Sequence, residues 1–182
     1  MLKWLKKHGK IRFNICTLFN NGIDLIFAGF GRRFQLKIKN RESAGNILAQ
    51  TLKDVIKKEE RADTIVLGLA RGGIILAEII ARKLSCHVDL IISKRLRAPH
   101  NEELTIGAIM EDGTTYLNES IIDALKIPRE YINREASDRI AEIRRLAQIY
   151  IYNNKSRLDI NDTNIKNKII VIVDDGAATG AT

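Results

Sequence analysis

The chain has 182 residues, of which 45% are hydrophobic and 5% aromatic, with two prolines and twelve glycines. One domain is the default at this length, and the apolar fraction excludes a disordered or collagen-like protein. The two cysteines, Cys16 and Cys86, are too few for a disulfide framework and stand in no CxxC or Cys/His cluster. This cysteine usage favours a reducing, cytoplasmic location.

The net charge of +8 comes entirely from the N-terminal part of the chain. Residues 1–40 contain nine Lys or Arg and one acidic residue, whereas residues 41–182 contain 21 of each sign. We therefore expect residues 1–33 to be a basic extension that packs weakly, and residues 34–182 to form the main domain. A nucleic-acid-binding surface on the extension is the alternative.

The apolar stretch 11–30 is not predicted to enter a membrane. It is interrupted by Arg12, three asparagines and Asp24, so it is too polar to span a bilayer and lacks the continuous core of a signal peptide.

From Asn40 onward the sequence shows regular helical and strand patterns. Apolar residues recur at helical spacing from Ala44 to Ile56, and Thr64–Leu69 is a β-branched run typical of a buried strand. Residues 74–84 predict a helix and residues 88–93 a second strand. Strand, helix and strand in this order predict a βαβ unit, hence an α/β fold with a parallel sheet flanked by helices.

The second half of the chain contains a loop, a hairpin, a helix and a strand. The charged segment 94–103 predicts a mobile loop, and Glu111-Asp112-Gly113 predicts the turn of a hairpin. Pro128 opens a helix predicted over residues 129–152. Five β-branched residues, Ile169–Val173, predict a strand buried on both faces.

Two carboxylates, Asp174 and Asp175, follow that last strand directly. Ligands of open α/β sheets bind at the carboxyl ends of the strands. After the acids comes a loop of small residues with the hydroxyls of Thr179 and Thr182, whose backbone N–H groups can surround a phosphate. Carboxylates repel phosphate and should face hydroxyls or a metal, so the pattern predicts a ribose 5-phosphate ligand.

This strand, acid pair and Thr-Gly-Ala-Thr loop closely resemble the phosphoribosyl pyrophosphate (PRPP) motif of type I phosphoribosyltransferases. The resemblance covers about four fifths of the chain and is strongest to a subgroup of uncharacterised, predicted phosphoribosyltransferases. It implies that Asp174 and Asp175 are catalytic, hold the ribose diol and lie near Mg²⁺. It implies that the loop holds the 5-phosphate through these residues: Gly176, Ala177, Ala178, Thr179, Gly180, Ala181 and Thr182.

The same resemblance implies a pyrophosphate-binding turn between the first strand and its helix, at Ala70, Arg71, Gly72 and Gly73. Taken alone, this turn fits equally well a degenerate dinucleotide loop or a plain tight connection. The loop after the second strand corresponds to the family's flexible lid, with Lys94 and Arg95 placed to meet pyrophosphate oxygens.

The implied activity is Mg²⁺-dependent transfer of the phosphoribosyl group from PRPP to a nitrogen nucleophile with release of pyrophosphate, in nucleotide metabolism. A homodimer is expected, and no residue identifies the acceptor or its general base. The family continues past the threonine loop, whereas this chain ends at Thr182, so we expect a C-terminally truncated domain. The alternatives are a non-catalytic PRPP or nucleotide sensor of the same fold, an inactive fragment, and a nucleotide-dependent oxidoreductase lacking GxGxxG.

Overall fold

The computed structural model describes residues 23–26, 33–36, 40–153 and 168–175. They divide into two compact units. The first unit comprises the described residues up to Ile91 together with residues 168–175. The second unit comprises the described residues from Ile92 onward, up to residue 153.

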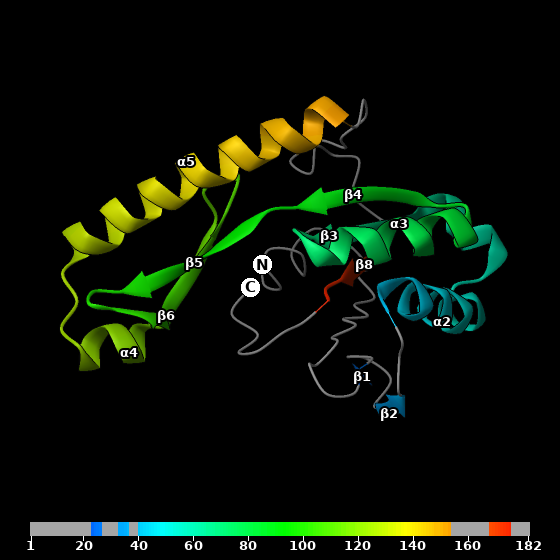
Figure 1. The fold of residues 1–182 in the computed structure, drawn as a ribbon, viewed down its shortest axis with the longest axis horizontal. Helices are drawn as coiled ribbons and strands as arrows, with labels where there is room; N and C mark the ends of the chain where they lie inside the picture. Colours follow the sequence, from blue (N-terminus) through cyan, green and yellow to red (C-terminus); the bar gives the residue numbers. More distant parts are fainter. Residues whose placement is uncertain (1–22, 27–32, 37–39, 154–167, 176–182) are drawn as a thin grey trace. The chain divides into compact units, whose positions relative to one another are not determined.

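The first unit contains a parallel sheet with β3 in its middle. The strands are β3 (Thr64–Leu69), β4 (His87–Ile91) and β8 (Ile169–Val173), and their order is β4-β3-β8 (Figure 1). Every residue of β3 is buried, as its largely apolar sequence predicts for a parallel strand between two neighbours. Strands β3 and β8 have the predicted bounds, and the parallel α/β architecture is confirmed.

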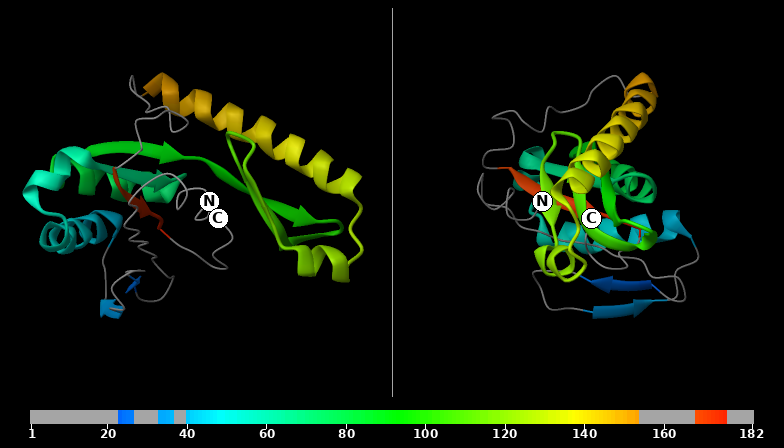
Figure 2. Two further views of the ribbon diagram at one scale, coloured as in Figure 1. Left: turned by 180° about the vertical axis from the view of Figure 1, so that it is seen from behind. Right: turned by 90° about the vertical axis from the view of Figure 1, so that its left-hand side faces the viewer.

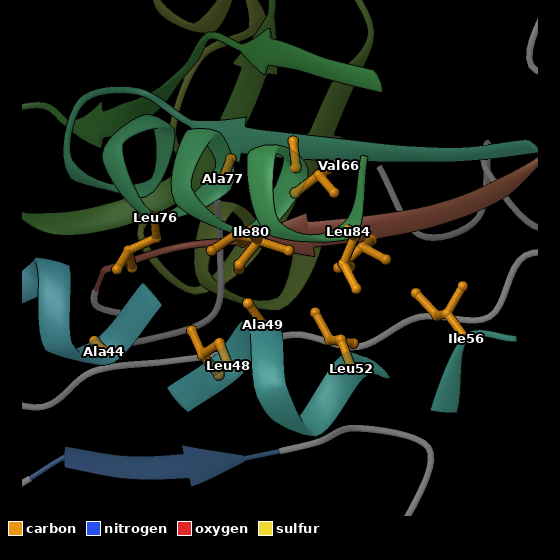
Figure 3. Packing of buried hydrophobic residues seen from close by; sticks show 13 residues of the cluster. Ala44, Leu48, Ala49, Leu52, Ile56, Val66, Leu76, Ala77, Ile80 and Leu84 are labelled. Atoms are coloured by element: carbon orange, nitrogen blue, oxygen red, sulfur yellow. The ribbon is translucent and has the colours of Figure 1, made fainter. Parts of the chain in front are cut away.

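Helices α2 (Arg41–Val55) and α3 (Gly72–Leu84) pack together beside this sheet. Their facing side chains, among them Leu48 and Ile80, are fully buried and form one cluster with Val66 of β3 (Figure 3). The Asn40 side chain caps α2 by accepting a hydrogen bond from the Ser43 amide at 2.9 Å. The cap therefore fixes the residue at which α2 begins, and the apolar side fixes how α2 packs.

A 3₁₀ helix, η1 (Lys58–Asp63), connects α2 to β3. At its end the Lys168 ammonium lies 2.5 Å from the Asp63 carboxylate, which ties the start of β8 to the start of β3. Near the N-terminus, β1 (Ile23–Ile26) and β2 (Arg33–Leu36) form an antiparallel pair. These two strands fall in and just after the segment expected to be a weakly packed extension.

The second unit is an antiparallel sheet with two helices. Strands β5 (Ser93–Ala98), β6 (Asn101–Met110) and β7 (Thr115–Leu117) pair in that order. The predicted turn at Glu111-Asp112-Gly113 joins β6 to β7, with Gly113 at a φ of +84° that glycine adopts readily. Helix α5 (Arg129–Asn153) follows the predicted span and packs its buried Ile132 and Ile143 side towards β5 and β6 (Figure 2).

One expectation for this unit needs correction. The segment 94–103 is not a loop: it forms the hairpin of β5 and β6 around Pro99 and His100. Leu96 and Ala98 are buried while Arg95 is exposed, which is the alternation of a half-buried strand. The short helix α4 (Glu119–Ala124), capped by Asn118, was not predicted.

Candidate functional site

The turn between β3 and α3 is built for close approach of backbone to backbone. A Cβ on Gly68 would lie 2.6 Å from the Ile74 Cα, so only glycine lets α3 pack this near β3. The Ala70 amide donates to the Ile91 carbonyl at 2.9 Å, which extends the β3–β4 ladder into the turn. The Ala70–Arg71 peptide bond is cis, the Arg71 residue is exposed, and α3 begins at Gly72. The turn thus presents a cation and a helix N-terminus together.

The acid pair after β8 lies directly against this turn. Strand β8 runs parallel to β3, with Gly68 opposite Val173, so both strands end at the same edge of the sheet. A Cβ on Gly73 would overlap the Val173 carbonyl and lie 3.1 Å from the Asp174 Cα. A Cβ on Gly72 would overlap the Asp175 carboxylate. The structure therefore brings Gly72 and Gly73 together with Asp174 and Asp175.

Asp175 is engaged by an arginine that the sequence reasoning did not single out. Arg41, the first residue of α2, donates to Asp175 Oδ2 from Nε at 2.9 Å and from Nη2 at 2.5 Å. The Arg41 side chain is 55% exposed and that of Asp175 is 22% exposed. The sequence gives one sign that Arg41 has a role beyond the helix. It is the first residue of α2, a position where the positive end of the helix dipole disfavours a cation.

Asp174 differs from Asp175 in its surroundings. Its Oδ1 accepts a hydrogen bond from the Asp175 amide at 2.8 Å, so the carboxylate is turned back over the chain as it leaves β8. The two adjacent acids consequently have distinct fixed orientations, with Asp175 directed to the turn and to α2.

The two cations predicted after β4 lie in the second unit, on β5. The Lys94 ammonium lies 2.5 Å from Glu142 Oε1 of α5, and Glu142 also accepts from Arg139 at 2.7 Å. The hydrogen bond from Lys94 holds the pKa of Glu142 below its ordinary value. Arg95 is exposed. Lys94 is thus committed to an ion pair within its own unit, whereas the Arg95 side chain faces solvent.

The predicted 5-phosphate loop, residues 176–182, lies outside the described residues. Within the described parts of the chain, no three His, Cys, Asp or Glu side chains cluster as ligands for a metal ion. This donor set fits Mg²⁺ only in the way that Mg²⁺ usually binds, through one or two carboxylates together with waters and substrate phosphates. Asp174 and Asp175 supply carboxylate oxygens of the required kind.

Comparison with known proteins assigns the chain to a family. The phosphoribosyl transferase domain family matches residues 35–182. The chain belongs to this family. The predicted type I phosphoribosyltransferase resemblance is therefore confirmed at the level of the family and the fold.

Named relatives agree with this assignment. The phosphoribosyl transferase domain is 33% identical over 143 residues to "Putative phosphoribosyl transferase" MT0597 and to Rv0571c, each from a strain of Mycobacterium tuberculosis. Both alignments cover 79% of this chain, and the chain spans only 30% of the length of each relative.

A solved structure shares the fold of the phosphoribosyl transferase domain. The crystal structure of TT1426 from Thermus thermophilus matches with a TM-score of 0.61 and 30% identity, over 79% of this chain and 64% of that one. No helix among the described residues is both long and apolar enough to cross a membrane.

Proposed function

We propose that this phosphoribosyl transferase domain binds PRPP and transfers its 5-phosphoribosyl group to a nitrogen nucleophile, releasing pyrophosphate. The contact between Gly72 and Asp175 carries the proposal. It joins a turn suited to an anion with a carboxylate suited to hydroxyls, and PRPP is a ligand that offers a diphosphate beside a ribose diol.

The turn supports binding of the diphosphate through charge and access. Arg71 is exposed beside the first residue of α3, where the helix dipole favours an anion. Gly72 and Gly73 carry no side chain, which lets the Asp175 carboxylate and the end of β8 lie against the start of α3, so that the acid pair and the turn adjoin. We assign Ala70, Arg71, Gly72 and Gly73 to the pyrophosphate. Lys94 and Arg95 are assigned to it on charge alone, and Lys94 would first exchange its Glu142 partner.

The acid pair supports binding of the sugar. We assign the Asp174 and Asp175 carboxylates to the ribose hydroxyls, with residues 176–182 as the cradle of the 5-phosphate. The chemistry that Mg²⁺ would supply with the bound substrate is neutralisation of charge on the leaving diphosphate. These carboxylates and the substrate oxygens would hold the Mg²⁺ ion.

We expect catalysis of this reaction to depend on electrostatic stabilisation and not on a covalent bond between substrate and protein. The bond from the anomeric carbon to the diphosphate oxygen breaks with its electron pair leaving on pyrophosphate. The acceptor nitrogen then forms the new bond to that carbon and releases its proton to solvent. The anomeric carbon becomes cation-like in between, and we assign its stabilisation to the negative charge of the Asp174 and Asp175 carboxylates.

Calorimetric titration of the 182-residue chain with PRPP and Mg²⁺ tests the site. The Asp174→Asn, Asp175→Asn double variant should lose measurable binding, while Asp63→Asn, at the opposite end of the sheet, should bind as the wild type does. Equal affinity of the acid-pair variant and the wild type would contradict the site assignment. Release of pyrophosphate from PRPP with any of a panel of nucleobases then distinguishes a transferase from a protein that only binds PRPP.

A further inference from the structure

Arg41 approaches Asp175 from a different element than the turn does. Both of its donating nitrogens reach the same oxygen, Oδ2, while the Gly72 backbone lies against the carboxylate. The Asp175 side chain is consequently confined between the first residue of α2 and the first residue of α3. Few rotamers satisfy both neighbours at once.

The place of Arg41 is itself fixed by the core. Arg41 is followed within one turn by Ala44 and then by Leu48, both fully buried against α3. The preceding residue, Asn40, caps the helix. The guanidinium therefore projects from a rigid base, which makes it suited to hold a partner in one orientation.

Helix energetics do not account for an arginine at this position. A cation at a helix N-terminus opposes the helix dipole, and an ion pair this exposed contributes only about 0–1 kcal/mol to folding. A role in substrate binding accounts for the Arg41–Asp175 ion pair. Asp174 and Asp175 repel the anionic PRPP, and Arg41 offsets one of these two charges while leaving both acids in place.

We infer that Arg41 is a positioning residue of the PRPP site, which orients the Asp175 carboxylate for the ribose hydroxyls and offsets its charge. This inference rests on the proposed function. It assigns to the site a residue of α2, an element that contributes neither the turn nor the acid pair.

The test compares PRPP affinity in Arg41 variants by calorimetry. Arg41→Ala should weaken binding about tenfold, the effect of losing one strong charge-assisted contact. Arg41→Lys should lose less, because a lysine retains the charge but not the two fixed donors. In an Asp175→Asn background, Arg41→Ala should cause a much smaller loss, because the orientation of the Asp175 carboxylate is no longer at stake and only the general attraction of a cation for PRPP remains.

Two control variants remove comparable ion pairs elsewhere. Arg129→Ala removes an exposed arginine that also opens a helix and pairs with Glu119 at 3.1 Å. Lys168→Ala removes the ion pair at the other end of β8. Both should bind PRPP as the wild type does. Wild-type affinity of Arg41→Ala, or the same fold loss with and without Asp175, would overturn the inference.

A measurement without PRPP separates this inference from the proposed function. The amide resonance of Gly72, in glycine-labelled protein, should move in Arg41→Ala and largely return in Arg41→Lys, because the Asp175 carboxylate lies against Gly72. An unmoved resonance overturns the positioning role even if PRPP binds. Absence of PRPP binding to the wild type, with the resonance responding as expected, overturns the proposed function alone.

Discussion

Lys94 of β5 and Glu142 of α5 are joined by a hydrogen bond of 2.5 Å, so that the long helix is fastened to the hairpin by a charged pair. Their side chains are 29% and 38% exposed, and the pKa of Glu142 is lowered chiefly by the Lys94 hydrogen bond. The pair is one of several polar contacts here. The Tyr131 hydroxyl, for example, donates to the Arg97 carbonyl at 3.1 Å.

This pair predicts a pH-dependent stability. Because the pKa of Glu142 is lower in the folded protein than its ordinary value of 4.5, its stabilisation is present above that value and is lost as the pH falls through the folded pKa. Glu142→Gln should lower the free energy of unfolding at pH 7 by about 0.5 kcal/mol, as for an exposed pair. It should have a smaller effect at acid pH. Thermal unfolding at both pH values, with Glu78→Gln of α3 as the control, checks this, and a pH-independent difference contradicts it.

Substitutions of the two glycines at the start of α3 should have different consequences. The new Cβ of Gly72→Ala meets the carboxylate of Asp175, a side-chain end that can move, whereas that of Gly73→Ala meets the Val173 carbonyl of the backbone. Gly72→Ala should therefore fold with little loss of stability and lose PRPP affinity. Gly73→Ala should cost about 1–3 kcal/mol of unfolding free energy, the usual penalty of overpacking. Denaturant unfolding and PRPP titration of both variants test the contrast, and equal destabilisation would contradict it.

Cys86 should react slowly with thiol reagents in the folded protein. Burial raises its pKa from 9.0 to about 11, which lowers the thiolate fraction at pH 8 about 100-fold. In a Cys16→Ser chain, where Cys86 is the remaining thiol, iodoacetamide labelling should be about 100-fold faster in urea than in buffer. Similar rates in both conditions would show that the thiol is accessible in the folded protein and that burial does not raise its pKa.

The packing of α2 on α3 predicts a large effect from one core residue. Ile80 of α3 is fully buried among side chains of α2 and the sheet, whereas Ile75 of the same helix is 47% exposed. Ile80→Ala should cost about 2–5 kcal/mol of unfolding free energy because it leaves a cavity. Ile75→Ala should cost less than about 1 kcal/mol. Denaturant unfolding measures both, and comparable losses would show that α3 is packed differently.

The sequence predicts most accurately the strands whose residues are buried on both faces of the sheet. The bounds of strands β3 and β8 agree to the residue because each is a largely apolar run: β8 lies between Lys168 and Asp174, and β3 lies between Asp63 and the turn that begins at Ala70. The segment of β5 resembles a loop in the sequence because its charges outnumber its apolar residues. Yet Leu96 and Ala98 alternate with Arg95 and Arg97, which is the pattern of a strand with one buried side.

The site was predictable only where its parts adjoin a strand end. Two acids after β8 and a glycine turn after β3 meet because parallel strands end at one edge, which topology alone dictates. The pairing of Arg41 with Asp175 joins residues 134 positions apart. It depends on where α2 lies on α3, and apolar periodicity gives the buried side of a helix but not the direction in which it points.

The two strands that pair with β3 are synthesised at very different times. Strand β4 follows β3 after a single helix. The other edge of β3 is paired only after β8 has left the ribosome, because Thr64 lies opposite Ile169. During that interval the nascent chain offers an apolar strand edge to any neighbour, the arrangement that invites intermolecular pairing. A chaperone that shields residues 64–69 until β8 has been synthesised should therefore raise the yield of native protein.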